Sequence, residues 1–562
     1  MSVESHEEIL RFQVGAMPLL NHISDRLNLK NILLDHISTH ANELIPAVNS
    51  LLLLIYNLAL GKYPLYKLNK WMSSIDLRCL GYDDNDSFNF TDDRFGRALI
   101  KLYNADRASI MTGIVLSAVK GFNIDLARIH NDSTSVKAYG KIPGKTKTGA
   151  ELKHGHSKDH RPDLKQLIFS LSISADGGVP VHHKTYPGNR SDDSTHIETW
   201  NTLVEICQLT DFLYVADSKL CTDEQLSYIT ARGGRAITIV PNTWKETKLF
   251  KEKLTKTKVA KVEIWRRTKP GTEDETEYFS AFKGEYFSEK RGYRLHWIYS
   301  SEKRERDRDS RNERLKKAEK ELSELVGKLN TRKYKTKEAI LLQSEKILSK
   351  YNIGEMIQIK IGTTKSKEVK QIGKGRPNEK TKYREIIEEL FTLYWLRDKT
   401  AIQDDMSFDG VFPLLSTDLD LKSEEVLKAY KYQPKIEKRF SQFKSLLDAA
   451  PLLFKCIYRV EANMFAFFIA LMLQALIERE VQQSMEGRGI ESIDIYPEKR
   501  CSKKPTANLV FELFESVSAY KIKKGDKVIG MSHDKLDKEQ KLVLRLLGMT
   551  EKEYWQGISK II

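Results

Sequence analysis

The sequence predicts an α/β protein whose sheet-forming core is interrupted by a long insertion and preceded by a helical domain. Two observations lead to this fold class. Short apolar strands alternate with helical stretches over residues 121–242, and the alternation resumes after residue 405, as in proteins that cover a sheet with helices. Between these parts, strand-like runs typical of a separate small sheet are followed by a highly charged helical stretch, which indicates an insertion.

The first 242 residues are expected to form the helical domain and the first part of the core. Residues 1–120 carry apolar residues at helical spacing. Two alternating runs then flank Asp176-Gly177-Gly178, which is a strong hairpin signal. The other elements expected before residue 243 are strands at 124–132, 211–217 and 236–241 and helices at 193–208 and 222–232.

Residues 243–405 are expected to form the insertion, and residues 406–480 the second part of the core. Three strand-like runs open the insertion. A charged helix follows, with a heptad-like apolar stripe made of Leu315, Ala318, Leu322, Leu325 and Leu329. The elements expected in the second part of the core are a strand at 409–416, a helix at 422–431, a helix starting near Pro434 and a long apolar helix at 454–480. The C-terminal residues 481–562 are expected to hold a hairpin around Gly525 and two short helices.

Composition is typical of a globular protein with a basic surface. Ninety-two Lys and Arg residues against 77 Asp and Glu give a net charge of +15, which is compatible with a nucleic-acid partner, although ribosomal and membrane-surface proteins share it. Five cysteines without a close pair favour a reducing compartment. No secretory signal is recognised, and the apolar stretch 464–477 is typical of a core helix. We therefore expect a cytoplasmic protein without a membrane partner.

Residues 363–384 of the insertion are strongly basic, with eight Lys and Arg residues and two Glu residues. A solvated linker is one interpretation of this composition. The other is contact with nucleic-acid phosphates, for which Lys374 and Arg376 are candidates.

Two sequence motifs are considered and set aside. Gly140 and Gly144 are separated by three residues, whereas a phosphate-binding loop of the Walker type needs four. A zinc site is conceivable from His154, His156 and His160, with His182 and His183 to join them, but no cysteine lies nearby and the stretch reads as a polar loop.

Three carboxylates are the strongest candidates for chemistry. Asp132 and Asp217 are each expected at the end of a strand, where sites of α/β proteins gather, although Asp commonly only caps a turn there. The helix that starts near Pro434 carries an apolar stripe made of Ile436, Phe440, Phe443 and Leu447. Glu437 lies beside this stripe and is therefore expected to point inward. Inward acids need a cation, and Mg²⁺ prefers carboxylate and phosphate oxygens.

These residues resemble the DDE transposases of prokaryotic insertion sequences, in the subgroup whose ribonuclease-H-like catalytic domain is interrupted by a β-rich insertion. The signature there is Y-x2-R-x3-E-x6-K, and this chain reads Tyr430-x2-Gln433-x3-Glu437-x6-Lys444. Asp132 in "HNDSTSV" and Asp217 in "VADSKL" match the first two acids of the family. The segments 155–166, 187–192 and 373–380 and the leading helical domain are similar as well. One departure stands out, because Gln433 occupies the position of the family's arginine.

The resemblance implies a fold, an activity and roles for residues. The core would be ribonuclease-H-like, and residues 1–120 would bind DNA ends. Asp132, Asp217 and Glu437 would hold two Mg²⁺ or Mn²⁺ ions, cut at the terminal inverted repeats and join the 3′-OH ends to target DNA. The resemblance also implies that the DNA strand is contacted by Tyr430, Lys438, Arg439 and Lys444 and that the active form is a homodimer.

Two alternatives stay open. One is a ribonuclease-H-like nuclease or resolvase that cuts DNA without joining it. The other is a domesticated, catalytically silent DNA-binding protein, which the loss of the arginine at Gln433 keeps in consideration.

Overall fold

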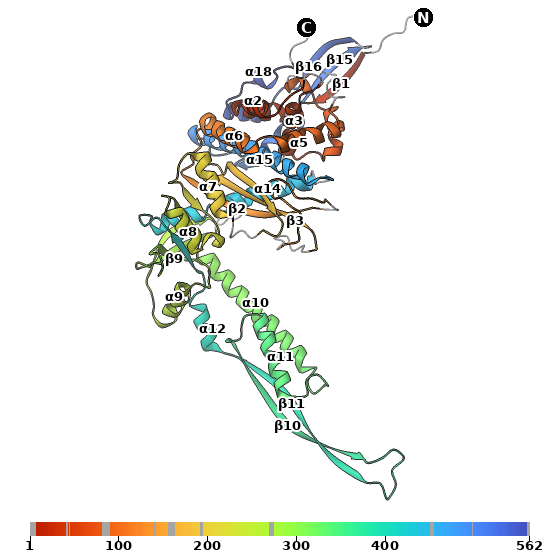
Figure 1. Cartoon of the computed structure of the whole chain (residues 1–562), viewed down its shortest axis with the longest axis vertical. Coiled ribbons are helices and arrows are strands. Elements are labelled where there is room, and N and C mark those ends of the chain that lie inside the picture. Colours follow the sequence, from red (N-terminus) through yellow and green to blue (C-terminus); the bar gives the residue numbers. More distant parts are fainter. Residues whose placement is uncertain are drawn as a thin grey trace. The chain divides into compact units, whose positions relative to one another are not determined.

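The computed structural model describes residues 7–40, 43, 45–80, 82, 90–138, 142–155, 163–190, 195–268, 275–449, 454–496, 498, 500–525 and 527–558. The chain divides into two compact units. Unit 1 consists of residues 1–238 and 428–562, and unit 2 consists of residues 239–427. Figure 1 labels the helices and strands of both units.

The leading segment of unit 1 is helical apart from one strand, β1 (Glu7–Gln13). Its helices are α1 (Met17–Arg26), α2 (Leu29–His36), α3 (Ala47–Leu60), α4 (Leu68–Met72), α5 (Asp92–Asn104) and α6 (Arg107–Phe122), with 3-10 turns η1 (Leu65–Lys67) and η2 (Leu77–Leu80). Side-chain caps fix where the last two helices begin, because Thr91 accepts from the Arg94 N–H and Asp106 from the Ser109 N–H.

Five strands of unit 1 form a mixed sheet in the order β4-β3-β2-β5-β6. They are β2 (Arg128–Lys137), β3 (Gln166–Ser174), β4 (Pro180–Pro187), β5 (Leu213–Val215) and β6 (Arg235–Ile239). The first three are antiparallel neighbours, whereas β5 runs parallel to both β2 and β6. The predicted hairpin around Gly177 and Gly178 is confirmed, and both glycines adopt positive φ in its turn. Helices α7 (His196–Cys207) and α8 (Asp223–Thr230) connect the later strands.

Helix α15 (Ile457–Gly487) is the central element of unit 1 (Figure 1). It contacts α3 and α5 of the leading segment, and also β4 and α14 (Pro434–Ala449). Its 31 residues are long and apolar enough to cross a membrane, but its most apolar window is completely buried inside the protein. Residues 464–477 are therefore part of a core helix, as the sequence predicts.

The C-terminal residues return to the start of the chain. Strands β15 (Ser518–Lys524) and β16 (Lys527–His533) form the hairpin predicted around Gly525, and β15 pairs with β1 along its length. The remaining elements are β13 (Ile493–Asp494), β14 (Cys501–Ser502), α16 (Ala507–Phe514), α17 (Lys538–Leu546) and α18 (Glu551–Tyr554). Residues 481–562 thus share a sheet with the N-terminal segment.

Unit 2 contains a four-stranded antiparallel sheet in the order β12-β9-β8-β7. Its strands are β7 (Lys261–Thr268), β8 (Thr276–Phe282), β9 (Arg294–Ser300) and β12 (Val411–Ser416), and the adjoining helices are α9 (Lys245–Lys256), α12 (Lys399–Met406) and α13 (Ser423–Tyr430). The three strands predicted for the insertion are confirmed. Helix α9 packs on this sheet through Phe250, whose ring stacks on Trp297 with 3.9 Å between centroids.

The rest of unit 2 is an arm of two helices and a β-ribbon. Helices α10 (Ser301–Val326) and α11 (Lys337–Lys350) pack against the base of an antiparallel pair, β10 (Ile357–Gln371) and β11 (Tyr383–Arg397). Of the predicted apolar stripe, Leu329 lies just beyond α10 and is partly buried, while the other four residues are buried. The linker interpretation of residues 363–384 is wrong, because they form the outer half and tip of the ribbon.

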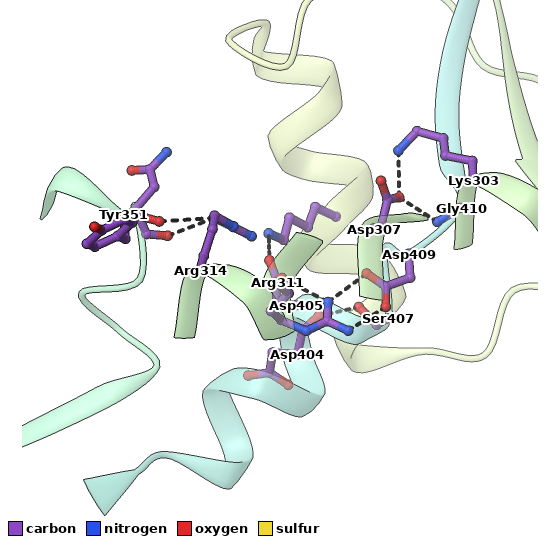
Figure 2. A network of polar contacts seen from close by, with 12 residues as sticks. Lys303, Asp307, Arg311, Arg314, Tyr351, Asp404, Asp405, Ser407, Asp409 and Gly410 are labelled. Carbon is purple, nitrogen blue, oxygen red and sulfur yellow. Dashed lines mark hydrogen bonds and ion pairs between the residues drawn. The ribbon is translucent and has the colours of Figure 1, made fainter. Parts of the chain in front are cut away.

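A buried ion-pair network joins α10 to the segment 405–410 (Figure 2). Arg311, 2% exposed, donates to Asp409 twice at 2.7 Å and to Asp405 at 3.1 Å. Lys251 also donates to Asp405, at 2.9 Å. Burial raises the pKa of Asp405, but Lys251 and Arg311 outweigh burial and hold the pKa below its usual value. Since both carboxylates depend on Arg311, the network ties the arm to the sheet of unit 2.

We expect Arg311→Met to destabilise unit 2 by roughly 3–5 kcal/mol, because Asp409 loses its buried cation and Asp405 is left with Lys251. Urea unfolding followed by tryptophan fluorescence, with the buried Trp297 as reporter, measures this. The difference in free energy of unfolding between wild type and Arg311→Met should become smaller as the pH falls below about 4. A carboxylate whose pKa is lowered in the folded state, such as Asp405, stabilises the protein above its unfolded-state pKa, and this effect is lost when the carboxylate is protonated.

Arg308→Met on the same helix is the matched control. Arg308 is exposed and pairs with the exposed Asp309 at 3.4 Å, so its loss should change the free energy of unfolding by no more than about 0.5 kcal/mol. Equal effects of the two substitutions would show that the network does not stabilise the arm.

Candidate active site

Parallel pairing of β2 and β5 brings two of the predicted acids to neighbouring strands. The paired residues end with His130 opposite Val215, and Asp132 and Asp217 each follow two residues later. Both aspartates are half-buried. Asp217 follows the end of β5 and caps the 3-10 turn η5 (Ser218–Leu220), accepting from the Lys219 N–H at 3.0 Å. Asp132 differs from the prediction, because β2 continues to Lys137 and Asp132 lies in mid-strand.

Helix α14 covers the sheet face that carries Asp132. Residues two apart on a strand share a face, so Asp132 lies on the face of His130, whose ring is 4.9 Å from that of Tyr432. On β3, Phe169 stacks on Phe443 of α14 at 4.4 Å. Because Leu171, the partner of Asp132 on β3, is two residues from Phe169, this contact confirms that α14 lies on the same face.

Glu437 occupies the first turn of α14, between these two aromatic contacts. The predicted apolar stripe is confirmed for Ile436, Phe440 and Phe443, which are buried. The expectation that Glu437 points inward is wrong, because its side chain is exposed. Glu437 follows Ile436 directly and is rotated by about 100° around the helix axis, which places it at the solvent edge of the buried stripe.

Tyr430 is the residue on which the three acids act together. Burial raises the pKa of its hydroxyl well above the usual value, and the negative charges of Asp217, Asp132 and Glu437 raise it further. The three acids come from three separate elements, and the charge of each raises the pKa of the half-buried Tyr430.

The donor set has the chemistry that a hard divalent ion requires, since all three side chains offer carboxylate oxygens. Within the described residues, no group of three or more His, Cys, Asp or Glu side chains lies close enough to chelate a single ion. Mg²⁺ commonly takes one or two carboxylates and completes its shell with water and substrate phosphates. The arrangement fits an ion held by Asp132 and Asp217 and closed by a phosphate.

The histidines near the site belong to the core. Burial lowers the pKa of His130 to about 3 and the pKa of His182 to about 4. His183 is buried against Phe465 and Phe468. Neutral histidines packed among aromatic rings indicate core side chains. Of the loop histidines considered for zinc, His156 and His160 lie outside the described residues.

Arg439, predicted as a DNA contact, is instead a buried structural residue. It is 1% exposed and donates to the carbonyls of Gly177 and Gly178 at 2.9 Å and to Glu478 at 2.8 Å. Burial raises the pKa of Glu478, but Arg439 and Lys438 outweigh it and hold the pKa below its usual value. With its nitrogens engaged inside the protein, Arg439 is unable to reach a phosphate.

The other predicted contacts lie in different settings. Lys438 is half-buried and donates to Glu478 at 3.2 Å, and Lys444 is half-buried on the same helix. Gln433 has a buried side-chain oxygen with no hydrogen-bond partner. Lys374 and Arg376 belong to unit 2, where they are exposed at the tip of the β-ribbon.

Sequence reasoning missed a cation, Lys504, that acts on α14 from another segment of the chain. Burial, Lys438 and Arg439 lower the pKa of Lys435, and Lys504 of the C-terminal region contributes as well. The spacing within 430–444 gives no sign of Lys504, because only the fold brings residue 504 to this helix. Glu478 was missed too, although Glu478 and Glu480 flank Arg479 inside an otherwise apolar helix.

Comparison with known proteins gives a family model for the leading segment and similarity to solved structures. A family model described as a domain of unknown function (DUF4277) matches residues 11–116, which contain the end of β1, helices α1 to α5 and part of α6. No curated protein matches. Among solved structures, the cryo-EM structure of a piggyBac transposase synaptic complex with hairpin DNA is similar at 8% identity and a TM-score of 0.36, covering 96% of this chain and 82% of that one. The conclusions below rest on this chain's own residues.

The burial of Arg439 predicts that Arg439→Ala lowers the free energy of unfolding by roughly 3–5 kcal/mol, because Glu478 loses its buried cation and is left with the half-buried Lys438. The salt dependence of DNA binding by the folded protein should stay unchanged. Urea unfolding and binding titrations at several salt concentrations measure the two effects.

Arg97→Ala is the control, since Arg97 is an exposed arginine on α5 of the same unit. It should leave stability within about 0.5 kcal/mol of wild type. A loss of salt dependence in Arg439→Ala without a loss of stability would restore Arg439 as a phosphate contact.

Proposed function

We propose that the chain is a DNA transposase of the DDE type, related to those of prokaryotic insertion sequences. The observation that carries the proposal is the pairing register that brings Asp132 and Asp217 to neighbouring positions, together with the joint effect of Asp217, Asp132 and Glu437 on the pKa of Tyr430. These four residues come from β2, from the residues after β5, and from α13 and α14. Their order and spacing are those of the signature that the sequence resembles.

We further propose that the sheet β4-β3-β2-β5-β6 is a ribonuclease-H-like core and that unit 2 contains its insertion. Support comes from the strand directions, with three antiparallel strands followed by two parallel ones. The first acid lies on the central strand β2 and the second follows its parallel neighbour. The second acid lies just beyond the carboxyl end of β5, where sites of α/β proteins form, whereas the first lies in mid-strand.

Asp132 and Asp217 would hold Mg²⁺ or Mn²⁺ ions, and Glu437 would complete the set when DNA is bound. Bound divalent ions would activate water or a 3′-OH and stabilise the leaving oxygen. The exposure of Glu437 suits this role, because a carboxylate at the solvent edge is reachable by a phosphate and its ions.

The chain's own residues would bind and orient the strand. Tyr430 keeps its proton at neutral pH because its pKa is raised, so its hydroxyl donates to a water or phosphate oxygen between the acids. Lys444, Lys438 and Lys435 line α14 on either side of Glu437 and offer cations for the flanking phosphates. Terminal inverted repeats and target DNA are the proposed partners, with a cytoplasmic homodimer as the active form.

A catalytically silent DNA-binding protein is the second candidate, and Gln433 is the observation that favours it. Its buried oxygen lacks a hydrogen-bond partner, where the family has an arginine that would bring a positive charge. A nuclease or resolvase that does not join DNA is the enzymatic alternative. Assays with labelled element ends and a plasmid target separate the three, since only a transposase both cuts and joins.

Asp217→Asn is expected to abolish cleavage and strand transfer together, by about 10³-fold or more, because the substitution removes the negative charge that a divalent ion needs while keeping the shape. Binding to element ends should survive, since it rests mainly on Lys and Arg contacts with phosphates. Asp132→Asn and Glu437→Gln should behave alike, and combining two of the changes should cost little more than one.

Asp211→Asn is the matched control, because Asp211 is an exposed aspartate just before β5, at the opposite end of the strand from Asp217. It should cleave at close to the wild-type rate. Cleavage in Mg²⁺ by purified Asp217→Asn at a comparable rate would refute the assignment of the acids.

Gln433→Arg tests whether the missing charge limits activity. We expect tighter end binding or faster cleavage, since the guanidinium brings a charge and the substitution removes an acceptor that lacks a partner. Gln433→Met, uncharged and of similar length, controls for the loss of that acceptor. Equal rates for wild type and Gln433→Arg would mean that another cation has taken over.

A further inference from the structure

The ribbon β10–β11 is ordered well beyond the part that packs on its own unit. Its residues pair one to one from Ile357↔Arg397 to Gln371↔Tyr383 without a bulge. At the base, Ile357, Phe391 and Leu393 are buried against α10 and α11. From Thr363 onward on β10, and up to Leu390 on β11, nearly every residue is exposed. In Figure 1 this outer half extends past the ends of both helices of the arm.

Charge divides the outer ribbon into a balanced stem and a basic tip. The stem, residues 363–370 and 384–390, carries four basic and four acidic residues. Two of the basic residues form ion pairs within the stem, Lys370 with Glu368 at 2.7 Å and Lys367 with Glu385 at 3.8 Å. The tip, residues 371–383, has one acidic residue, Glu379, against four basic ones. The basic residues of the tip are Lys374, Arg376, Lys380 and Lys382.

Among the described residues, none of these four tip cations forms an ion pair, so the tip presents uncompensated charge. The tip is nevertheless built by its own hydrogen bonds. Ile372 N–H donates to the Lys382 carbonyl at 2.8 Å, and Gln371 donates to the Gly375 carbonyl at 3.0 Å. Asn378 and Thr381 close the turn between them. A structured loop with free cations is suited to a polyanion, because ordering it on binding costs little.

Exposed apolar side chains add a second feature. Val369, Ile387 and Tyr383 are 53–60% exposed, and the pairing register puts all three on one face of the ribbon. The major groove of B-DNA, about 12 Å wide, admits a two-stranded ribbon and offers thymine methyl groups to apolar side chains. The nine residues from Thr363 to Gln371 span about 30 Å at about 3.4 Å each, close to one helical turn of DNA.

We propose that the outer β10–β11 ribbon lies in the major groove of duplex DNA, with the tip cations on its phosphates. The proposal deepens the proposed function, on which it rests for the choice of DNA as partner. Charge complementarity favours DNA over a second copy of the chain. The stem has equal numbers of basic and acidic residues, so the net positive charge of the outer ribbon lies at its tip. Lys365, Lys367 and Lys370 of the stem are not phosphate contacts in this arrangement.

The first test is salt-dependent binding of the full chain to a duplex of about 30 base pairs without element ends. Replacing Lys374, Arg376, Lys380 and Lys382 together by Ala should flatten the slope of log affinity against log salt by about 0.9 for each lost contact, or about 3–4 in all. The four side chains are exposed and unpaired, so the variant should fold. Replacing the exposed Lys316, Lys320, Arg332 and Lys346 of the arm makes the same change in charge and should leave the slope nearly unchanged.

The second test is methylation protection, because guanine N7 lies in the major groove and adenine N3 in the minor groove. Wild type should protect guanine N7, and the tip variant should lose that protection. Protection of adenine N3 instead, an unchanged slope, or equal slopes for tip and control variants would overturn the proposal. A change in oligomeric mass with no change in slope would overturn it too, by assigning the ribbon to a second copy.

These readouts do not require cleavage. Asp217→Asn protein should show the wild-type slope and N7 protection. If no DNA is ever cut but the tip variant still flattens the slope, the proposed chemistry fails while the ribbon's role in DNA binding is supported.

Discussion

Hydrogen bonds that pair β2 in parallel with β5 run from Arg128↔Leu213 to His130↔Val215, and the candidate site depends on that register. A shift of one residue would turn one aspartate to the opposite face of the sheet. In the observed register, two half-buried carboxylates follow at equal positions on neighbouring strands. In the proposed site, a divalent ion would lie between these two carboxylates, so the proposed metal chemistry depends on this register.

The third acid depends on a different interaction, the buried pair between Arg439 and Glu478. Arg439 is two residues from Glu437 on α14, and Glu478 lies on the central helix α15. Glu478 also accepts from the Ala507 N–H at 3.1 Å, at the start of α16. One carboxylate thus connects the helix of the candidate site, the core helix and the C-terminal region. The C-terminal residues contribute to the position of Glu437 through this contact, although they lie at least 70 residues away in the sequence.

Much of the fold was predictable because its patterns are local. The Asp176-Gly177-Gly178 hairpin, the strands of the insertion and the apolar stripe of α14 follow from spacing and turn residues alone. Three features could not be predicted from local patterns. Asp132 was expected at a strand end because polar residues follow it, yet the chain stays extended through "STSVK" as an inner strand. Arg439 reads as a surface cation until Glu478 is brought to it. The sequence of the ribbon left a linker open as an interpretation. A two-stranded element that is exposed on both faces lacks the alternation of apolar and polar residues by which a strand is predicted.

The net charge of the chain is therefore a weak guide to where it would bind a polyanion. Which basic residues already form ion pairs with carboxylates is a better guide. Arg439 and Arg311 are among the most deeply buried large side chains, and each is neutralised by carboxylates within its own unit. The lysines of the ribbon stem are exposed, yet acids of the same ribbon balance them. What remains available is the set of cations that folding leaves without an acid, and in the outer half of the ribbon most of this set lies at the tip. A charge that is already compensated has little to gain from a phosphate, so the fold, more than the composition, decides which of the 92 basic residues serve binding.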